Sequence, residues 1–197
     1  MQTFVINLQE RCDRLEHIIK QMEKENIYWT WIEGVDKNLI NRNDYEIDCY
    51  RSISKGSIGC YLSHYKCYEK ATEDLLLVFE DDVVLEESFN ELLKEAIDKV
   101  PKDFDVLFLG GTASYWKRHC HTYGKIKRVE NNYFKVNGDF YGAEGYVITA
   151  RARKIMIENK FPIRYPGGDI PLCRNGLNVY CLKDKICRQA RMGSDIN

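Results

Sequence analysis

The chain has 197 residues, of which 44% are hydrophobic and 30% charged, and its formal net charge is -1. This length fits one globular domain over residues 1–197, and the balanced charge gives no reason to expect a nucleic-acid partner. No stretch approaches the ~18 consecutive apolar residues of a membrane span, and the N-terminus lacks the basic and apolar regions of a signal peptide. The eight cysteines include no Cys-x-x-Cys pair, which favours free thiols over a zinc or redox centre. We therefore expect a cytoplasmic protein without a transmembrane segment, and leave peripheral contact with a membrane open.

The first half of the chain alternates between strand-like and helical patterns. Apolar residues at i, i+3, i+4 and i+7 indicate helices, and short runs of β-formers indicate strands. The expected elements are a strand at 3–8, a helix at 13–25, a strand at 28–35, a long loop over 36–55, a helix at 57–72, a strand at 75–79 and a helix at 89–100. Ser88 followed by Glu91 is a capping-box pattern, which predicts the start of the last of these helices.

The second half is less regular but continues the alternation. It predicts a strand at 105–109, a hairpin over 125–137 about Asn131 and Asn132, a strand at 145–149, a helix at 150–159 and a late strand at 179–182. We expect the segment 119–121, His-Cys-His, to be an exposed loop rather than a metal cluster. Strands that alternate with helices indicate an α/β fold with a mostly parallel twisted sheet flanked by helices, to which the hairpin adds antiparallel strands.

Three consecutive acidic residues, Glu80, Asp81 and Asp82, directly follow the apolar run Leu75–Phe79. Ligands bind at the carboxyl ends of strands in open α/β sheets, and clustered carboxylates repel one another unless a cation neutralises them. Side chains of an extended segment alternate between faces, so we expect Glu80 and Asp82 to point into one cleft and Asp81 away from it. Their hard oxygen atoms suit Mg²⁺ or Mn²⁺ together with a phosphate-bearing ligand. The alternative is a solvated acidic turn.

Several spaced segments together resemble glycosyltransferase family 25, which includes bacterial lipooligosaccharide galactosyltransferases and collagen galactosyltransferase domains. They are 4–8 with Arg11, Asp13 and Arg14, then 56–64, 79–85, 105–110, 142–149, 163–169 and 194–196. The resemblance implies a single GT-A type nucleotide-sugar-binding domain. It also implies transfer of a hexose, galactose or glucose, from a UDP-sugar to a hydroxyl of a glycan, glycolipid or protein, with inversion. The chain departs from the family pattern in its short length, in Gly167-Gly168-Asp169 where Pro-Val-Asp is usual, and in Glu144.

The resemblance also implies site residues for the donor and the metal. Glu80 and Asp82 fall on the acidic element that holds the divalent metal, Mn²⁺ or Mg²⁺, and the donor. The family context also favours Ser63 and His64 as donor-binding residues. Asn7, Arg11 and Asp36 are expected to bind the donor because they follow predicted strands, with turn formation as the alternative for Asn7 and Asp36. We favour Arg11 over Arg14, because Arg14 lies on the predicted amphipathic helix, where a charge is usually solvated.

Two carboxylates compete for the role of catalytic base. Inversion needs a single displacement, in which the acceptor hydroxyl loses its proton to a positioned carboxylate. Asp169 falls on a second acidic position of the family, and Glu144 is the other candidate. Asp169 could instead be the N-cap of a helix that begins at Ile170, since Asp is a good cap and Pro171 suits a first turn.

Two alternative functions compete with the transferase. A nucleotide-sugar-binding domain without transfer activity is compatible with the short length and the altered Gly167-Gly168-Asp169 segment. A phospho-receiver domain is disfavoured, because its phosphoacceptor aspartate would end a later strand, whereas Leu109 here leads into Gly110 and Gly111.

Overall fold

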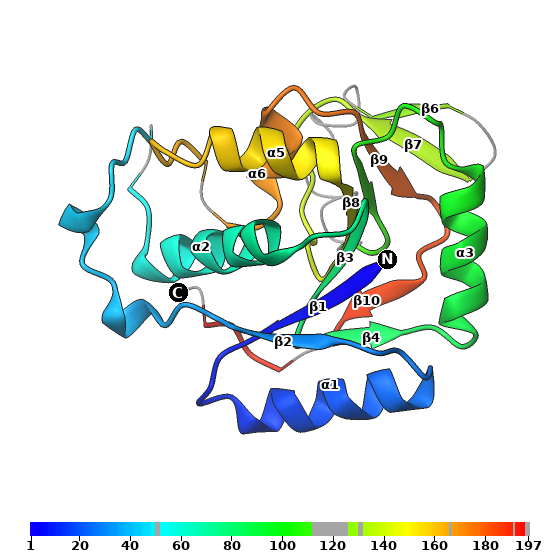
Figure 1. The fold of residues 1–197 in the computed structure, drawn as a ribbon, viewed down its shortest axis with the longest axis horizontal. Helices are drawn as coiled ribbons and strands as arrows, with labels where there is room; N and C mark the ends of the chain where they lie inside the picture. The colour runs from blue at the N-terminus through cyan, green and yellow to red at the C-terminus, as the bar shows by residue number, and fades with distance from the viewer. Residues whose placement is uncertain (50–51, 112–125, 130–131, 166, 191, 196–197) are drawn as a thin grey trace.

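The computed structural model describes residues 1–49, 52–111, 126–129, 132–165, 167–190 and 192–195. Its centre is an eight-stranded sheet (Figure 1). In spatial order the strands are β2 (Thr30–Glu33), β1 (Gln2–Asn7), β3 (Leu75–Glu80), β8 (Gly145–Thr149), β5 (Val106–Phe108), β9 (Val179–Leu182), β7 (Tyr133–Val136) and β6 (Ile126–Arg128). Strands β8 and β7 run against the others, so the sheet is mostly parallel, as predicted.

The antiparallel strands lie partly where the sequence predicts them. Strands β6 and β7 pair as the expected hairpin, with residues 130–131 of its turn outside the described part of the chain. Strand β8 was not expected to be antiparallel, yet it lies between β3 and β5 and opposes both. Residues 137–144 join β7 to β8 without a helix, and β5 and β9 lie between these two strands in the sheet, so the direction of β8 is set by its long-range pairing with β3 and β5.

Helices cover both faces of the sheet (Figure 1). The helices are α1 (Cys12–Lys24), α2 (Lys55–Lys70), α3 (Phe89–Lys99), α5 (Ala150–Glu158) and the short α6 (Ile170–Arg174). On β3, Leu76 and Val78 pack into one core with residues of α2 and α5, whereas Leu77 and Phe79 pack into a second core with residues of α1 and α3. The continuous apolar run that ends before Glu80 is therefore buried on both faces. The predicted long loop after β2 contains two single turns, η1 (Lys37–Leu39) and η2 (Arg42–Asp44).

A second, two-stranded sheet was missed by the sequence analysis. It pairs β4 (Val83–Leu85) with β10 (Cys187–Gln189) in antiparallel register. Just beyond it, the backbone N–H of Ala190 donates to the carbonyl of Asp82 at 2.6 Å. Each strand has three residues, too few to show a periodic pattern. The pairing brings the end of the chain back to the acidic turn between β3 and β4.

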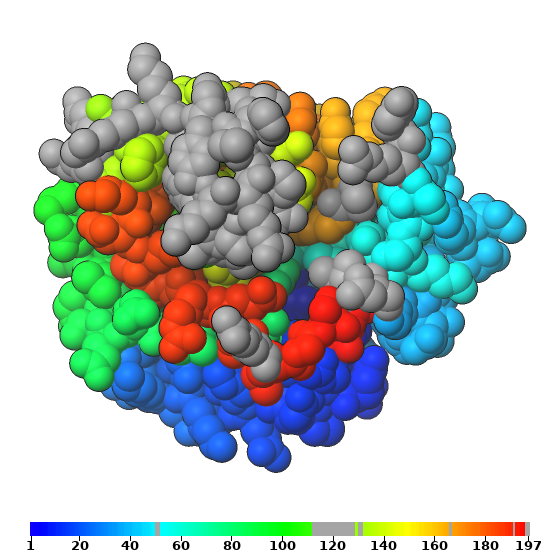
Figure 2. Space-filling model, turned by 180° about the vertical axis from the view of Figure 1, so that it is seen from behind, coloured from blue at the N-terminus to red at the C-terminus, as the bar shows by residue number. Residues whose placement is uncertain are grey.

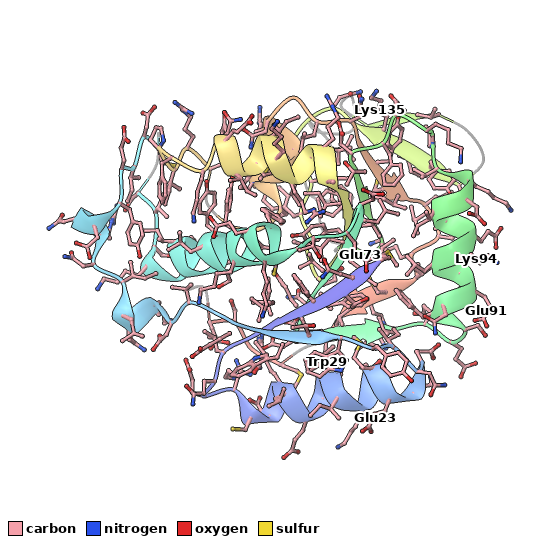
Figure 3. All side chains as sticks on the ribbon, in the orientation of Figure 1. Glu23, Trp29, Glu73, Glu91, Lys94 and Lys135 are labelled. Atoms are coloured by element: carbon pink, nitrogen blue, oxygen red, sulfur yellow. The ribbon has the colours of Figure 1, made fainter. Side chains whose placement is uncertain are left out.

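The start of α3 is capped differently from the prediction. Ser88 has φ +59° and its side chain makes no cap hydrogen bond. Instead, the backbone N–H of Phe89 donates to Glu25 Oε2 at 2.9 Å, from the residue that follows α1. Figure 3 shows Glu91 and Lys94 on the outer side of α3, where both are exposed. The helix was predicted correctly and the capping box was wrong, because a carboxylate distant in sequence satisfies the helix terminus.

Two further expectations concern cysteines and membranes. The seven cysteines in the described residues are free thiols, and the His-Cys-His segment 119–121 lies outside these residues. Within the described part of the chain, no helix combines the length and the apolar character that crossing a membrane requires.

Candidate active site

A pocket opens at the ends of β1 and β3, beside the loop after β2 and the first turns of α2. The C-terminal residues close one side of it; Figure 2 shows this red segment lying against the blue N-terminal part of the chain. The predicted donor and metal residues that line the pocket are Asn7, Asp36, Ser63, His64, Glu80 and Asp82. Arg11 is absent from this lining, whereas Arg14 is part of it.

Asp81 also lines the pocket, and the prediction that it points away is wrong. Strand β3 ends at Glu80, so the two-residue alternation does not extend into the turn that contains Asp81. Its carboxylate accepts a hydrogen bond from Asn7 Nδ2 at 2.8 Å and forms an ion pair with Arg14 Nη1 at 2.7 Å. Asn7 also donates to the carbonyl of Arg11 at 3.2 Å. Asn7 and Arg14 therefore fix the acidic turn to the end of β1 and the start of α1.

Asp82 and Glu80 carry negative charge that the protein compensates only in part. Asp82 is 2% exposed; its Oδ2 accepts from Gln189 Nε2 at 3.1 Å and lies 3.5 Å from Arg14, while its Oδ1 has no hydrogen-bond partner among the described residues. Burial, and next the charge of Glu80, raise the pKa of Asp82 to about 7. Burial and the charge of Asp169 raise the pKa of Glu80 to about 7. A bound cation would relieve this repulsion.

Two arginines attach the C-terminal segment to the pocket. Arg14 Nη2 donates to the carbonyl of Gly193 at 2.5 Å, and Arg11 Nη2 donates to the carbonyl of Met192 at 2.9 Å. Arg11 also pairs with Asp195, which itself lines the pocket. Sequence reasoning treated Arg14 as a solvated helix charge, but its position toward the acidic turn makes it the buried counter-ion of the site.

His64 lies on α2 with its ring 2% exposed. Its Nδ1 hydrogen-bonds the hydroxyl of Tyr146 at 2.8 Å, and its Nε2 lies 3.3 Å from Glu80 Oε1. Burial lowers the pKa of His64 to about 4, so the ring is neutral at physiological pH. The neighbouring Ser63 donates to the carbonyl of Gly59 at 2.7 Å and accepts from the backbone N–H of Val35 at 2.8 Å.

Ser63 and Asp36 both line the pocket, and both side chains also hold nearby backbone in place. Ser63 ties α2 to the loop after β2, and Asp36 caps η1 by accepting from the backbone N–H of Asn38 at 2.8 Å. Both remain predictions as donor-binding residues, since each lines the pocket while its side chain already accepts a backbone hydrogen bond.

The two candidate bases lie outside the lining of the pocket. Asp169 accepts backbone hydrogen bonds from Ile170 at 2.8 Å and from Gly142 at 3.0 Å, which confirms that it caps α6. Glu144 is 2% exposed and accepts from the backbone N–H of Gly111 at 2.5 Å. Burial raises the pKa of both carboxyls. The role of base remains a prediction for each.

Cys60 is a pocket residue that the sequence analysis did not single out. Its Sγ, a ring nitrogen of His64 and a carboxylate oxygen of Glu80 all lie within 4.8 Å of one another. No other group of three or more His, Cys, Asp or Glu side chains in the described residues comes together in this way. The four-residue spacing of Cys60 and His64 on a predicted helix was the available signal, because it places both on one helix face.

Comparison with known proteins connects this site to a family. The profile of glycosyltransferase family 25, described as an LPS biosynthesis protein family, matches residues 1–170. Human procollagen galactosyltransferase 2 is 28% identical over 178 residues, which cover 80% of this chain and 28% of that protein. A putative glycosyltransferase of Haemophilus influenzae is 29% identical over 164 residues, covering 79% of this chain and 56% of that protein. The chain thus spans between about a quarter and just over half of the length of these relatives.

The fold agrees with that of solved glycosyltransferases. The galactosyltransferase LgtC superposes with a TM-score of 0.52 at 15% identity, over 91% of this chain and 71% of LgtC. The mixed sheet with an acidic turn after β3 is therefore of the GT-A type. The family profile, which matches most of the length of this chain, shows that the chain belongs to glycosyltransferase family 25.

Proposed function

We propose that the protein transfers a hexose from a UDP-sugar to an acceptor hydroxyl, with inversion and with the help of a divalent metal. The observation that carries this proposal is the under-compensated pair Glu80 and Asp82 in a pocket at the strand ends of a GT-A fold. Galactose is the first sugar to test, since the human relative is a procollagen galactosyltransferase, and glucose the second. The acceptor is a hydroxyl of a glycan, a glycolipid or a protein.

The residues present fit a hard divalent ion. Mg²⁺ and Mn²⁺ take one or two protein carboxylates and fill their shell with water and substrate phosphates. Asp82 offers the unpartnered Oδ1, and Glu80 reaches the pocket with a side chain that is 23% exposed. When bound, such a metal would stabilise the negative charge that develops on the leaving diphosphate. Asp81 is committed to Arg14 and Asn7, which leaves Asp82 and Glu80 as the ligands.

The arginines would assist the metal in binding the donor. The Arg14 guanidinium lies among the acidic residues at the pocket wall, and Arg11, outside the lining, contacts the pocket residue Asp195 and the carbonyl of Met192. Arginine forks suit phosphate oxygens, so both can contact the diphosphate if the C-terminal segment yields some of these contacts. Asn7, Asp36, Ser63 and His64, which also line the pocket, would contact the rest of the donor.

For the base we favour Asp169 over Glu144, because a base must reach the acceptor. Asp169 is partly exposed, whereas Glu144 is 2% exposed. The two backbone hydrogen bonds to Asp169 hold its orientation and leave lone pairs on both oxygens. A carboxylate so placed would take the proton of the acceptor hydroxyl as the hydroxyl attacks the sugar.

A binding domain without transfer activity is the second candidate. Human inactive glycosyltransferase 25 family member 3 is 34% identical over 128 residues, which cover 55% of this chain and 21% of that protein. Turnover separates the two candidates: both would bind UDP with metal, but only the transferase would consume a UDP-sugar.

The first test is the melting temperature with UDP, with and without Mn²⁺. At about 100 times the dissociation constant a ligand stabilises by ~2.7 kcal/mol, which corresponds to ~5–11 °C for a protein of this size. We expect Asp82→Asn to lose the Mn²⁺-dependent part of this shift, and Asp98→Asn on the exposed face of α3 to keep it. If UDP and a panel of UDP-sugars give no Mn²⁺-dependent shift, the proposal is wrong. Release of UDP, and the anomeric configuration of the product by NMR, then test transfer and inversion.

A further inference from the structure

We propose that Cys60, His64 and Glu80 form a second metal site, for a borderline-soft divalent cation such as Zn²⁺. We further propose that Zn²⁺ bound there inhibits the protein by withdrawing Glu80 from the donor's metal. The inhibition rests on the proposed function, whereas the binding of Zn²⁺ does not.

The three side chains already stand at spacings that suit one ion. Cys60 and His64 lie one turn apart on α2, and Glu80 ends β3 beside them. Tetrahedral zinc with bonds of ~2.0–2.1 Å to nitrogen and oxygen places those two ligand atoms ~3.3–3.4 Å apart. His64 Nε2 and Glu80 Oε1 are 3.3 Å apart, and the sulfur of Cys60 lies within 4.8 Å of a ring nitrogen of His64 and of a carboxylate oxygen of Glu80. Small side-chain rotations would complete the site.

An outer hydrogen bond fixes the imidazole for ligation. His64 Nδ1 contacts the hydroxyl of Tyr146 at 2.8 Å, and that hydroxyl contacts the hydroxyl of Tyr68 at 2.8 Å. Both tyrosines are buried. With Nδ1–H donating to Tyr146, the lone pair of Nε2 is directed toward Glu80. Histidines that bind metals are held in the same way, by a hydrogen bond on the other ring nitrogen.

The space beside Nε2 depends on Gly168. A Cβ on this residue would lie 2.2 Å from His64 Nε2, about the length of a metal–nitrogen bond. Any other amino acid at position 168 would therefore crowd the coordinating nitrogen. The Gly167-Gly168 pair is one of the places where this chain departs from the family pattern, so the room beside Nε2 depends on a residue that is not usual there.

The donor set selects the class of metal. A thiolate with an imidazole and a carboxylate suits Zn²⁺ or Co²⁺, while Mg²⁺ and Mn²⁺ favour oxygen ligands. On binding, the metal replaces the thiol proton of Cys60, which leaves to solvent. Three protein ligands leave a fourth position, and since all three residues line the pocket, that position faces the donor site.

The binding test uses Co²⁺ as a spectroscopic probe of the full chain, without donor. We expect a thiolate-to-cobalt charge-transfer band and the visible bands of tetrahedral Co²⁺, both removed by added Zn²⁺. Cys60→Ser should abolish the charge-transfer band, and Gly168→Ala should weaken Co²⁺ binding by at least the ~10–100-fold that loss of an outer hydrogen bond costs. Cys120→Ser is the matched control, because it changes the other segment where Cys and His stand together. The band should survive in it.

A second measurement on the unaltered protein does not depend on how the variants fold. Iodoacetamide labelling followed by mass spectrometry should show Zn²⁺ protecting Cys60 but not the exposed Cys12. A band that is absent, that survives in Cys60→Ser or that vanishes in Cys120→Ser overturns the site, as does unprotected Cys60. Inhibition is then tested by adding Zn²⁺ to Mn²⁺-dependent UDP binding. If no Mn²⁺-dependent UDP binding is found even without Zn²⁺, the proposed function alone is refuted, because the cobalt spectrum that tests the Zn²⁺ site is recorded without donor.

Discussion

Arg14 is the buried positive charge of the acidic turn, and its removal should be costly. Its side chain is 9% exposed and that of its partner Asp81 is 7% exposed, with 2.7 Å between Nη1 and Oδ1. Arg14→Met removes the charge, keeps much of the apolar stem and leaves the carboxylates of Asp81 and Asp82 unbalanced. Breaking a buried ion pair from one side costs ~3–5 kcal/mol. Because domains are typically stable by ~5–15 kcal/mol, the variant should still fold.

The assay is urea unfolding in EDTA, so that no metal replaces the lost charge. In a thermal melt, the same loss of unfolding free energy would lower the melting temperature by ~6–20 °C for a protein of about 150–250 residues. Arg11→Met is the matched control, since the carboxylates of its partners Asp13 and Asp195 are 56% and 37% exposed and such pairs contribute ~0.2–1 kcal/mol. Adding Asp81→Asn to Arg14→Met should restore ~0.5–3 kcal/mol of the lost free energy of unfolding, and this amount is the coupling energy of the pair.

Two results would refute this reasoning. The first is a cost for Arg14→Met no larger than that of Arg11→Met, which would mean that Arg14 is solvated in solution. The second is an absence of coupling between Arg14 and Asp81, which would mean that the ion pair does not carry the cost.

Three further predictions test neighbouring parts of the site. Burial raises the pKa of Glu144, so the folded state holds this proton more tightly and the associated stability is lost as pH rises through the folded pKa; urea unfolding should show Glu144→Gln gaining stability relative to the wild type as the pH rises above about 4.5. Asp169→Asn keeps a good N-cap, so it should spare donor affinity and cut the transfer rate by ~10²–10⁴-fold; near-normal transfer would move the base to Glu144. Gly168→Ala should cost ~1–3 kcal/mol in unfolding measurements through its clash with His64, and more than Gly34→Ala, whose Cβ would meet the flexible end of a leucine at 3.0 Å; equal costs would contradict the packing.

Much of the fold follows from local patterns in the sequence. The run Leu75–Phe79 is apolar throughout, and a strand of that kind must be buried on both faces, as β3 is. Helical spacing predicts α1, α2, α3 and α5 to within a few residues, because an amphipathic helix repeats its apolar face every turn. The carboxyl ends of parallel strands meet at one edge, so the strand assignments place Asn7 and the acidic turn at the same edge of the sheet, and the pairing of β1 with β3 makes them neighbours.

The tertiary structure decided the contacts between segments that are distant in sequence. The pairing of β4 with β10 rests on two three-residue strands, and α3 is capped by Glu25 across 64 residues. Helical periodicity says which face of α1 carries Arg14, but only the packing of α1 against the sheet turns that charge toward Asp81. Likewise, the spacing of Cys60 and His64 puts them on one face of α2, and the register of that helix against β3 brings Glu80 to them. Local sequence sets each side chain's face, and only packing sets what that face meets.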